Sequence, residues 1–189
     1  MTRDEALKIL DELKNSPNMK KHGLAVGFAM AALYDFFQKG RKNPEMKKGD
    51  WEIAGILHDA DYEITNKSLD LHTEETTKKL KEIKADQLII DAIRGHCDKA
   101  PRNTLMAKAV YAADELTGLI VAAALIQPDK KLKSVTVDSV MRKFKDKSFA
   151  AGANRDQIKT CESELKIDLE EFASVTLNAM QEKSRELGL

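Results

Sequence analysis

A chain of 189 residues, of which 42% are hydrophobic and 33% are charged, has the composition of a soluble globular protein and is long enough for one domain with a real core. Lysine plus arginine and aspartate plus glutamate number 31 each, so charge alone cannot hold a nucleic-acid backbone or an anionic membrane surface. Any recognition of phosphate must therefore be local.

Apolar residues recur with helical spacing in nearly every segment, and no sustained alternation of β-branched and polar residues supports a strand. We therefore predict an all-α fold. A first helix is expected from about Thr2 to Lys14, and the sequence Ser16-Pro17-Asn18 should end it. Asn18 is then predicted to cap a second helix, which continues to Gly40 and carries His22 in its first turns.

A short helix from Trp51 to His58 is apolar on most sides and should be buried, with Asp50 as its N-cap. It delivers His58 and Asp59 at its C-terminal end. After a turn region, we expect helices over 69–83, 86–96, 104–126, 136–144 and 156–165, and a last one capped by Asp168 with Glu171 as its capping-box partner. No repeat or low-complexity segment interrupts this series, so residues 1–189 should form a single domain.

His58 and Asp59 carry the first indication of chemistry. They end a buried helix and are followed by Asp61 and Glu63, so several carboxylates crowd two potential ligands at one helix end. Negative charge at a helix C-terminus is unfavourable unless a cation compensates it. The segment therefore indicates a metal site.

Asp114 gives a second indication, because it interrupts the apolar run from Ala107 to Ile126. An unpaired buried carboxylate would cost roughly 2 to 7 kcal/mol, and more when ionised. A divalent cation would neutralise this carboxylate, and so would a structural salt bridge. A ligand set of imidazoles and carboxylates suits zinc, iron, manganese or nickel better than calcium.

The two remaining histidines, His72 and His96, lie early in one helix and at the end of another, where they could hold a second metal ion. Taken singly, each would be interpreted as an ordinary surface or hydrogen-bonded core histidine. A shared site would include all four histidines of the chain. One site then explains all four positions, whereas unrelated roles would need four separate explanations.

The order of His22, then His58-Asp59, then Asp114, on separate helices, resembles the HD superfamily of metal-dependent phosphohydrolases. The runs LHDADYE (57–63), YAADELTGLIVA (111–122) and KFKDKSFAAGANR (143–155) are similar to those of small stand-alone bacterial and archaeal HD proteins. The resemblance implies an HD-domain helical bundle with a metal-binding core at about 18–126 and additional C-terminal helices at about 127–189.

The resemblance also implies two sets of ligands. A first metal ion would be coordinated by His22, His58, Asp59 and Asp114. His72 and His96 would hold a second ion, with Asp59 bridging the two. The cofactor would be one or two divalent ions, such as iron, manganese, zinc, nickel or magnesium. No Gly-Tyr-Pro follows the His-Asp pair, so the cyclic-dinucleotide phosphodiesterase subgroup is not matched.

The expected function is hydrolysis of a nucleotide or another small phosphate ester by metal-activated water. The candidate catalytic residues are Asp59, Asp61 and Glu63, the last two for proton transfer or for orienting a ligand histidine. Candidate phosphate contacts are Lys145, Lys147 and Arg155, although charged residues on helices usually face water. We expect no long nucleic acid as a partner, because no basic stripe with interleaved aromatic residues is present.

Two other functions fit the same residues. One is a noncatalytic module that keeps the HD scaffold to bind a nucleotide or a partner, and the other is a di-iron HD oxygenase. An open coordination position would favour catalysis, whereas a closed ligand shell would favour a structural role. Oxygen consumption by iron-loaded protein would identify an oxygenase.

The expected location is cytoplasmic, with no membrane partner. The N-terminus, MTRDEALKIL, lacks the apolar core of a secretory signal, and the longest apolar stretch, Leu116 to Ile126, is too short to span a bilayer. Cys97 and Cys161 lie far apart, and a chain of this size does not need a disulfide, which fits a reducing compartment.

Overall fold

Every regular element is a helix in the computed structural model, which describes all residues from Met1 to Leu189, so the all-α prediction is confirmed. The elements are α1 Arg3–Glu12, α2 Pro17–Lys39, α3 Lys48–Leu57, α4 Glu74–Glu82, α5 Gln87–Gly95, α6 Leu105–Leu125, the 3-10 turn η1 Leu132–Ser134, α7 Val137–Lys145, α8 Arg155–Ser163, α9 Leu169–Glu182 and α10 Ser184–Leu187. None of these helices is long and apolar enough to cross a lipid bilayer.

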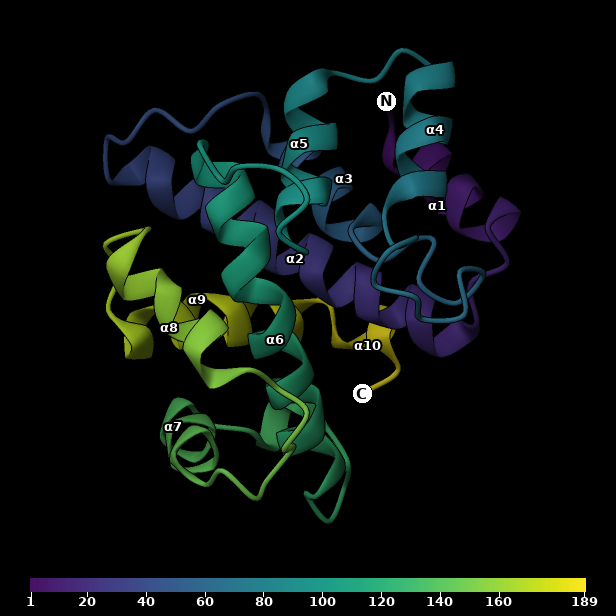
Figure 1. The fold of residues 1–189 in the computed structure, drawn as a ribbon. Helices are drawn as coiled ribbons and strands as arrows, with labels where there is room; N and C mark the ends of the chain where they lie inside the picture. Colours follow the sequence, from purple (N-terminus) through teal and green to yellow (C-terminus); the bar gives the residue numbers. More distant parts are fainter.

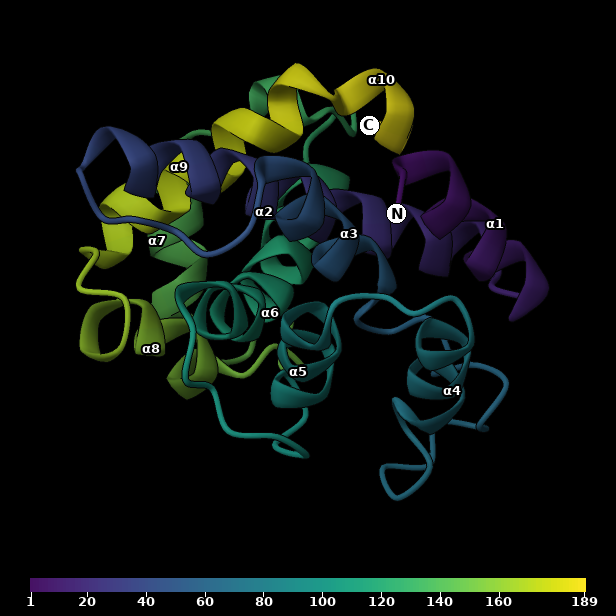
Figure 2. The ribbon, with the colours of Figure 1, turned by 90° about the horizontal axis from the view of Figure 1, so that it is seen from above.

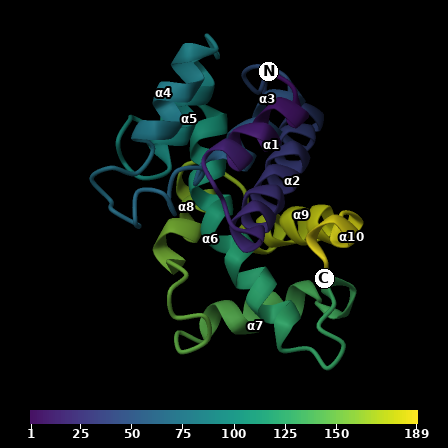
Figure 3. The same cartoon turned by 90° about the vertical axis from the view of Figure 1, so that its right-hand side faces the viewer.

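The two longest helices, α2 and α6, cross at the centre of the molecule (Figure 1). Helix α2 also packs against α3 and α9, and α6 also packs against α5, α7 and α8. One continuous apolar core joins these helices and includes the fully buried side chains of Phe37, Trp51 and Phe172. Helices α4 and α5 lie at one end of α6 and α7 at the other (Figure 3).

Helices α2 and α3 approach so closely that their crossing requires glycine. A Cβ atom on Gly55 would lie 2.7 Å from the backbone Cα of Gly27, and one on Gly23 would lie 2.5 Å from the carbonyl oxygen of Ile56. Contacts as short as these with backbone atoms would push the two helices apart. The glycines therefore allow α2 to bring its side chains next to the C-terminal end of α3.

Two helices begin earlier than predicted. Ser16, and not Asn18, is the N-cap of α2, because its side chain accepts a hydrogen bond from the Met19 N–H while Pro17 occupies the first helical turn. Helix α3 begins at Lys48, and Asp50, the predicted N-cap, lies inside its first turn. There its carboxylate accepts a hydrogen bond from the backbone N–H of Lys47 at 3.1 Å.

The N-caps predicted at Thr2 and Asp168 are confirmed. Thr2 accepts a hydrogen bond from the backbone N–H of Glu5, whose carboxylate bonds back to the Thr2 N–H. Asp168 accepts from the backbone N–H of Glu170. The reciprocal bond expected from Glu171 is not formed, so the capping box predicted for α9 is wrong.

The helix predicted to start at residue 69 begins only at Glu74. The preceding residues form turns, and Thr73 has a left-handed backbone with φ of 67°, a conformation that costs of order 1–3 kcal/mol in a residue with a branched side chain. The carboxylate of Asp61 compensates, because it accepts hydrogen bonds from the backbone N–H groups of Thr73 at 2.8 Å and Thr76 at 3.0 Å. A side chain from an earlier turn region thus caps α4. Figure 2 shows α4 at the edge of the molecule, joined to the rest by this loop.

Candidate metal centre

Four predicted ligands from α2, the end of α3 and α6 converge on one point. The Nε2 atom of His22 lies 3.1 Å from Nε2 of His58 and 3.1 Å from Oδ1 of Asp114. Nε2 of His58 lies 3.3 Å from the same Asp114 oxygen. Oδ2 of Asp59 completes the group at 3.5 and 3.6 Å from the two histidine nitrogens. These four residues form a group that could hold a metal ion, and we call it the first cluster.

The second cluster consists of His72, His96 and the other oxygen of Asp59. The two Nε2 atoms lie 3.0 Å apart, and Oδ1 of Asp59 lies 3.1 Å from that of His72 and 3.2 Å from that of His96. Asp59 therefore directs one carboxylate oxygen at each cluster. This is the arrangement expected of a carboxylate that bridges two ions.

Hydrogen bonds at Nδ1 fix the orientation of three of the four histidine rings. Nδ1 of His58 lies 2.7 Å from the carbonyl oxygen of Gly55, and Nδ1 of His96 contacts that of Ile93. A carbonyl oxygen only accepts, so Nδ1 of each ring carries the hydrogen and Nε2 carries the lone pair. His72 donates from Nδ1 to Asp61 at 3.0 Å. If both rings were neutral, the lone pairs of His72 and His96 would face each other, which is favourable only with a proton or a metal ion between them.

The spacing of the donor atoms suits a divalent ion. Donors bound about 2.1 Å from one ion, in tetrahedral or octahedral geometry, lie roughly 3.0 to 3.4 Å from each other. The separations in both clusters fall in or close to this range. Imidazole nitrogens with carboxylate oxygens are also the donors that zinc, iron, manganese and nickel accept. The residues present therefore fit the divalent ions predicted from the sequence.

The charge balance of the protein residues alone favours bound cations. Burial lowers the pKa of His22, but its hydrogen bonds with Asp114 and Asp59 outweigh this effect and raise the pKa to about 10. Burial likewise lowers the pKa of His72, while Asp59 and Asp61 raise it to about 9. Without metal, protons on these histidines compensate the carboxylates. Metal ions would displace those protons.

A family model of the HD domain matches residues 19–119, more than half of the chain. The chain belongs to the HD-domain family. HD domains form a superfamily of metal-dependent hydrolases, and the matched range contains all six residues of the two clusters. No curated protein and no solved structure matches the chain.

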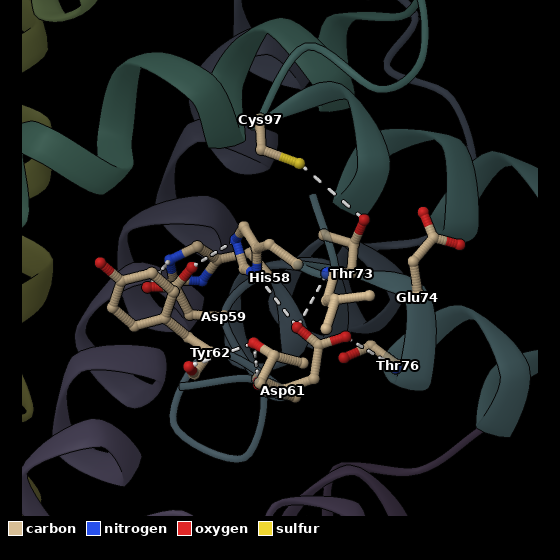
Figure 4. A network of polar contacts seen from close by, with 12 residues as sticks. His58, Asp59, Asp61, Tyr62, Thr73, Glu74, Thr76 and Cys97 are labelled. Carbon is tan, nitrogen blue, oxygen red and sulfur yellow. Dashed lines mark hydrogen bonds and ion pairs between the residues drawn. The ribbon is translucent and has the colours of Figure 1, made fainter. Parts of the chain in front are cut away.

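In this HD domain Asp61 lies directly behind the second cluster, with its side chain fully buried. Figure 4 shows its carboxylate directed at Thr73 and Thr76, and the same carboxylate accepts the Nδ1–H of His72. Burial raises the pKa of Asp61, but these three hydrogen bonds outweigh it and hold the pKa below its usual value. Of its two predicted roles, proton transfer and orientation of a ligand histidine, the geometry favours orientation.

Glu63 holds a different part of the structure. Its carboxylate accepts a hydrogen bond of 2.6 Å from the backbone N–H of Ser16, the N-cap of α2. Beside it, Nδ2 of the buried Asn15 donates to the carbonyl oxygen of Ala60 at 2.6 Å. These two bonds connect the start of α2 to the turn that carries Asp59. This contact favours a structural role for Glu63 over the predicted proton transfer. Asn15 was not among the residues predicted from the sequence.

Arg155, a predicted phosphate contact, does not have a free guanidinium. It donates to the carbonyl oxygens of Lys143, Asp146, Phe149, Ala150 and Ala153, and so closes the loop between α7 and α8. These contacts favour a structural role for Arg155, and its predicted phosphate contact stays untested. Lys145, the last residue of α7, and Lys147, on this loop, are both exposed. Their contact with phosphate stays a prediction.

Glu115, which the sequence analysis also missed, connects that loop to the metal centre. It follows Asp114 on α6, and its carboxylate accepts a hydrogen bond of 2.9 Å from the backbone N–H of Asn154. Burial raises the pKa of Glu115, and the charges of Asp114 and Asp59 act in the same direction. The loop is thus attached next to a first-cluster ligand.

Cys97 lies beside the second cluster, grouped with His72 and His96. Its sulfur donates a hydrogen bond to the carbonyl oxygen of Arg94 at 3.5 Å, and burial raises its pKa. Both facts favour the neutral thiol over a thiolate ligand.

Proposed function

We propose that this HD domain hydrolyses a small phosphate ester, such as a nucleotide, at a centre of two divalent ions. The observation that chiefly supports the proposal is the position of Asp59, whose two oxygens each face a separate pair of histidines. Metal-dependent phosphoryl chemistry often uses two ions to neutralise the attacking and the leaving oxygen.

The proposed chemistry depends on what the bound ions supply and on how the chain holds them. Divalent ions lower the pKa of bound water to roughly 7 and neutralise charge that develops on phosphoryl oxygens. The backbone carbonyls of Gly55 and Ile93 keep two histidine rings in the tautomer that binds metal. The first cluster offers four donor residues and the second offers three. Fewer protein donors leave more coordination positions for water and substrate in the second cluster.

Substrate would approach from the side of the first cluster. The side chains of His22, Asp59 and Asp114 are 27%, 18% and 17% exposed, whereas those of His58, His72 and His96 are 0%, 4% and 4% exposed. Water and a phosphate group can therefore reach the three more exposed ligands. The other three histidines form the buried side of the centre.

A small ester fits the charge distribution around the centre. Arg94 and Lys99 are both paired with Glu74, and Arg155 is bound to backbone carbonyls. Neutralisation of phosphate would then fall mainly to the metal ions, which suits one phosphoryl group better than a long polyanion. Lys145 and Lys147 remain our candidates for contacts with the outer part of the ester.

We further propose that residues 1–189 act as one domain. Helices α8 and α9 pack on α6 and α2, and the Glu115–Asn154 hydrogen bond ties the loop before α8 to the metal-binding helix. The C-terminal helices would thus form one wall of the substrate site.

The experiment is metal analysis of protein purified without chelator, followed by a screen of phosphomonoesters and phosphodiesters. His58→Ala and Asp59→Ala should lose metal and activity together. Asp138→Asn, an exposed change on the distant helix α7, is the matched control and should retain both. Unchanged hydrolysis in His58→Ala and Asp59→Ala would contradict the proposed function.

A further inference from the structure

Lys99 connects the two segments that carry the histidines of the second cluster. It follows His96 by three residues, and its Nζ donates to the carbonyl oxygens of His72 at 2.7 Å and Asp70 at 2.6 Å. The same Nζ lies 3.1 Å from the carboxylate of Glu74. These three contacts use all three N–H bonds of the ammonium group. The Lys99 side chain is only 20% exposed, so the contacts are partly shielded from water.

The carbonyl groups that Lys99 binds have no backbone hydrogen-bond donor. They belong to the turns before α4, where helical bonding is interrupted and Thr73 has a positive φ. His72 therefore lacks the support that a helix gives to His22. Its ring is fixed by Asp61 at Nδ1, and its backbone is fixed by Lys99.

We infer that Lys99 is a positioning residue for the second metal ion. By tying the turn of His72 to the end of the segment of His96, it keeps the two Nε2 atoms 3.0 Å apart. The inference rests on the second ion of the proposed function. The first cluster does not depend on Lys99, because its ligands are held by α2, the end of α3 and α6. Lys99 therefore sets the affinity of the second position and leaves that of the first unchanged.

The test is a titration of metal-free protein with Mn²⁺. Binding is monitored by calorimetry and by the electron paramagnetic resonance signal of coupled manganese pairs. The parent should show a tighter and a weaker binding phase. Lys99→Met should weaken the second phase about 10- to 100-fold, the usual effect of losing an outer-shell partner, and leave the first phase unchanged. Lys99→Arg keeps donors for the carbonyl groups and should recover part of the loss.

Lys42→Met is the matched control, because Nζ of Lys42 also donates to a carbonyl, that of Leu165 at 2.8 Å, away from both clusters. It should change neither phase. Circular dichroism establishes that each variant is folded, and if Lys99→Met fails to fold, a weaker second phase in Lys99→Arg supports the inference. Unchanged affinity of the second phase, or equal weakening of both phases, overturns it.

The outcomes separate this inference from the proposed function. Two manganese phases without hydrolysis of any ester would reject the function and leave the role of Lys99 intact. A single manganese ion per parent chain would overturn the role of Lys99, while hydrolysis at one metal ion could still be observed.

Discussion

The Nε2 atoms of His72 and His96 lie 3.0 Å apart, although 24 positions separate the two residues in the chain. Both rings already use Nδ1 in hydrogen bonds, to Asp61 and to the carbonyl of Ile93, so both Nε2 atoms are available to the same cation. With Asp59 beside them, the fold gathers two imidazoles and a carboxylate around one point.

Metal binding should release protons near neutral pH. The pKa values of His22 and His72, about 10 and about 9, lie above 7, so both are protonated in metal-free protein and must lose their protons to bind metal. The affinity for Mn²⁺ should therefore rise as pH increases from 7 to 9. Calorimetry in buffers of different ionisation enthalpy measures the protons released. Binding without proton release at pH 7 would contradict this account of the centre.

Asp61→Asn should destabilise the metal-free protein in a pH-dependent way. The pKa of Asp61 in the folded protein is below its ordinary value of 3.8, so its stabilising effect is complete above that pH and is lost as pH falls through the folded pKa. We expect a loss of about 1–3 kcal/mol at pH 7 that becomes smaller below pH 4. Urea unfolding at pH 7, 5 and 3 measures it. A difference between variant and parent that is the same at all three pH values would argue against the prediction.

Gly55→Ala should separate α2 from α3. The new Cβ would meet the backbone of Gly27 at 2.7 Å, and backbone cannot move aside as a flexible side chain can. We expect a loss of roughly 1–3 kcal/mol in the free energy of unfolding and weaker binding of the first ion. Gly118→Ala is the control, since nothing lies within 4 Å of its Cβ position and alanine favours a helix by up to about 1 kcal/mol. Equal stability of the two variants would contradict this description of the crossing.

Arg155→Met should lower the thermal stability without lowering the metal content. The five carbonyl groups would lose their hydrogen bonds with the guanidinium, and only those of Asp146 and Ala150 also accept from a loop backbone N–H, so the expected cost is roughly 1–3 kcal/mol. Lys147→Met should leave the melting temperature unchanged and, if Lys147 contacts the ester, raise KM. Thermal melts and metal analysis distinguish these effects. An Arg155→Met protein with the parent's melting temperature and a raised KM would contradict the structural role and support the predicted phosphate contact.

The sequence predicted the all-α fold because helical periodicity is a local signal, repeated in every segment. Asp114 could be identified as a candidate ligand for a similar reason, since one carboxylate in a long apolar run is visible without a structure. The structure then places it 3.1 Å from His22. Convergence of ligands from separate helices follows from packing, which periodicity alone does not specify.

The supporting contacts could not be predicted, because they cross turns whose backbone geometry no local pattern encodes. Asp61 caps a helix whose first residues lie 12 to 15 positions further along, and Lys99 reaches a carbonyl 27 positions before it. Arg155, in contrast, was identified from the sequence, but its role was not. A basic residue in a polar segment suits either phosphate or backbone carbonyls, and only the path of its loop decides which.

The most direct test of the two-ion centre is the number of metal ions bound per chain in the parent and in Asp59→Ala, measured after saturation with Mn²⁺ and removal of the excess. Because Asp59 serves both clusters, we predict two ions in the parent and fewer than one in the variant, with two in the Asp138→Asn control. Two ions retained by Asp59→Ala, or none bound by the parent, would contradict a centre built around Asp59.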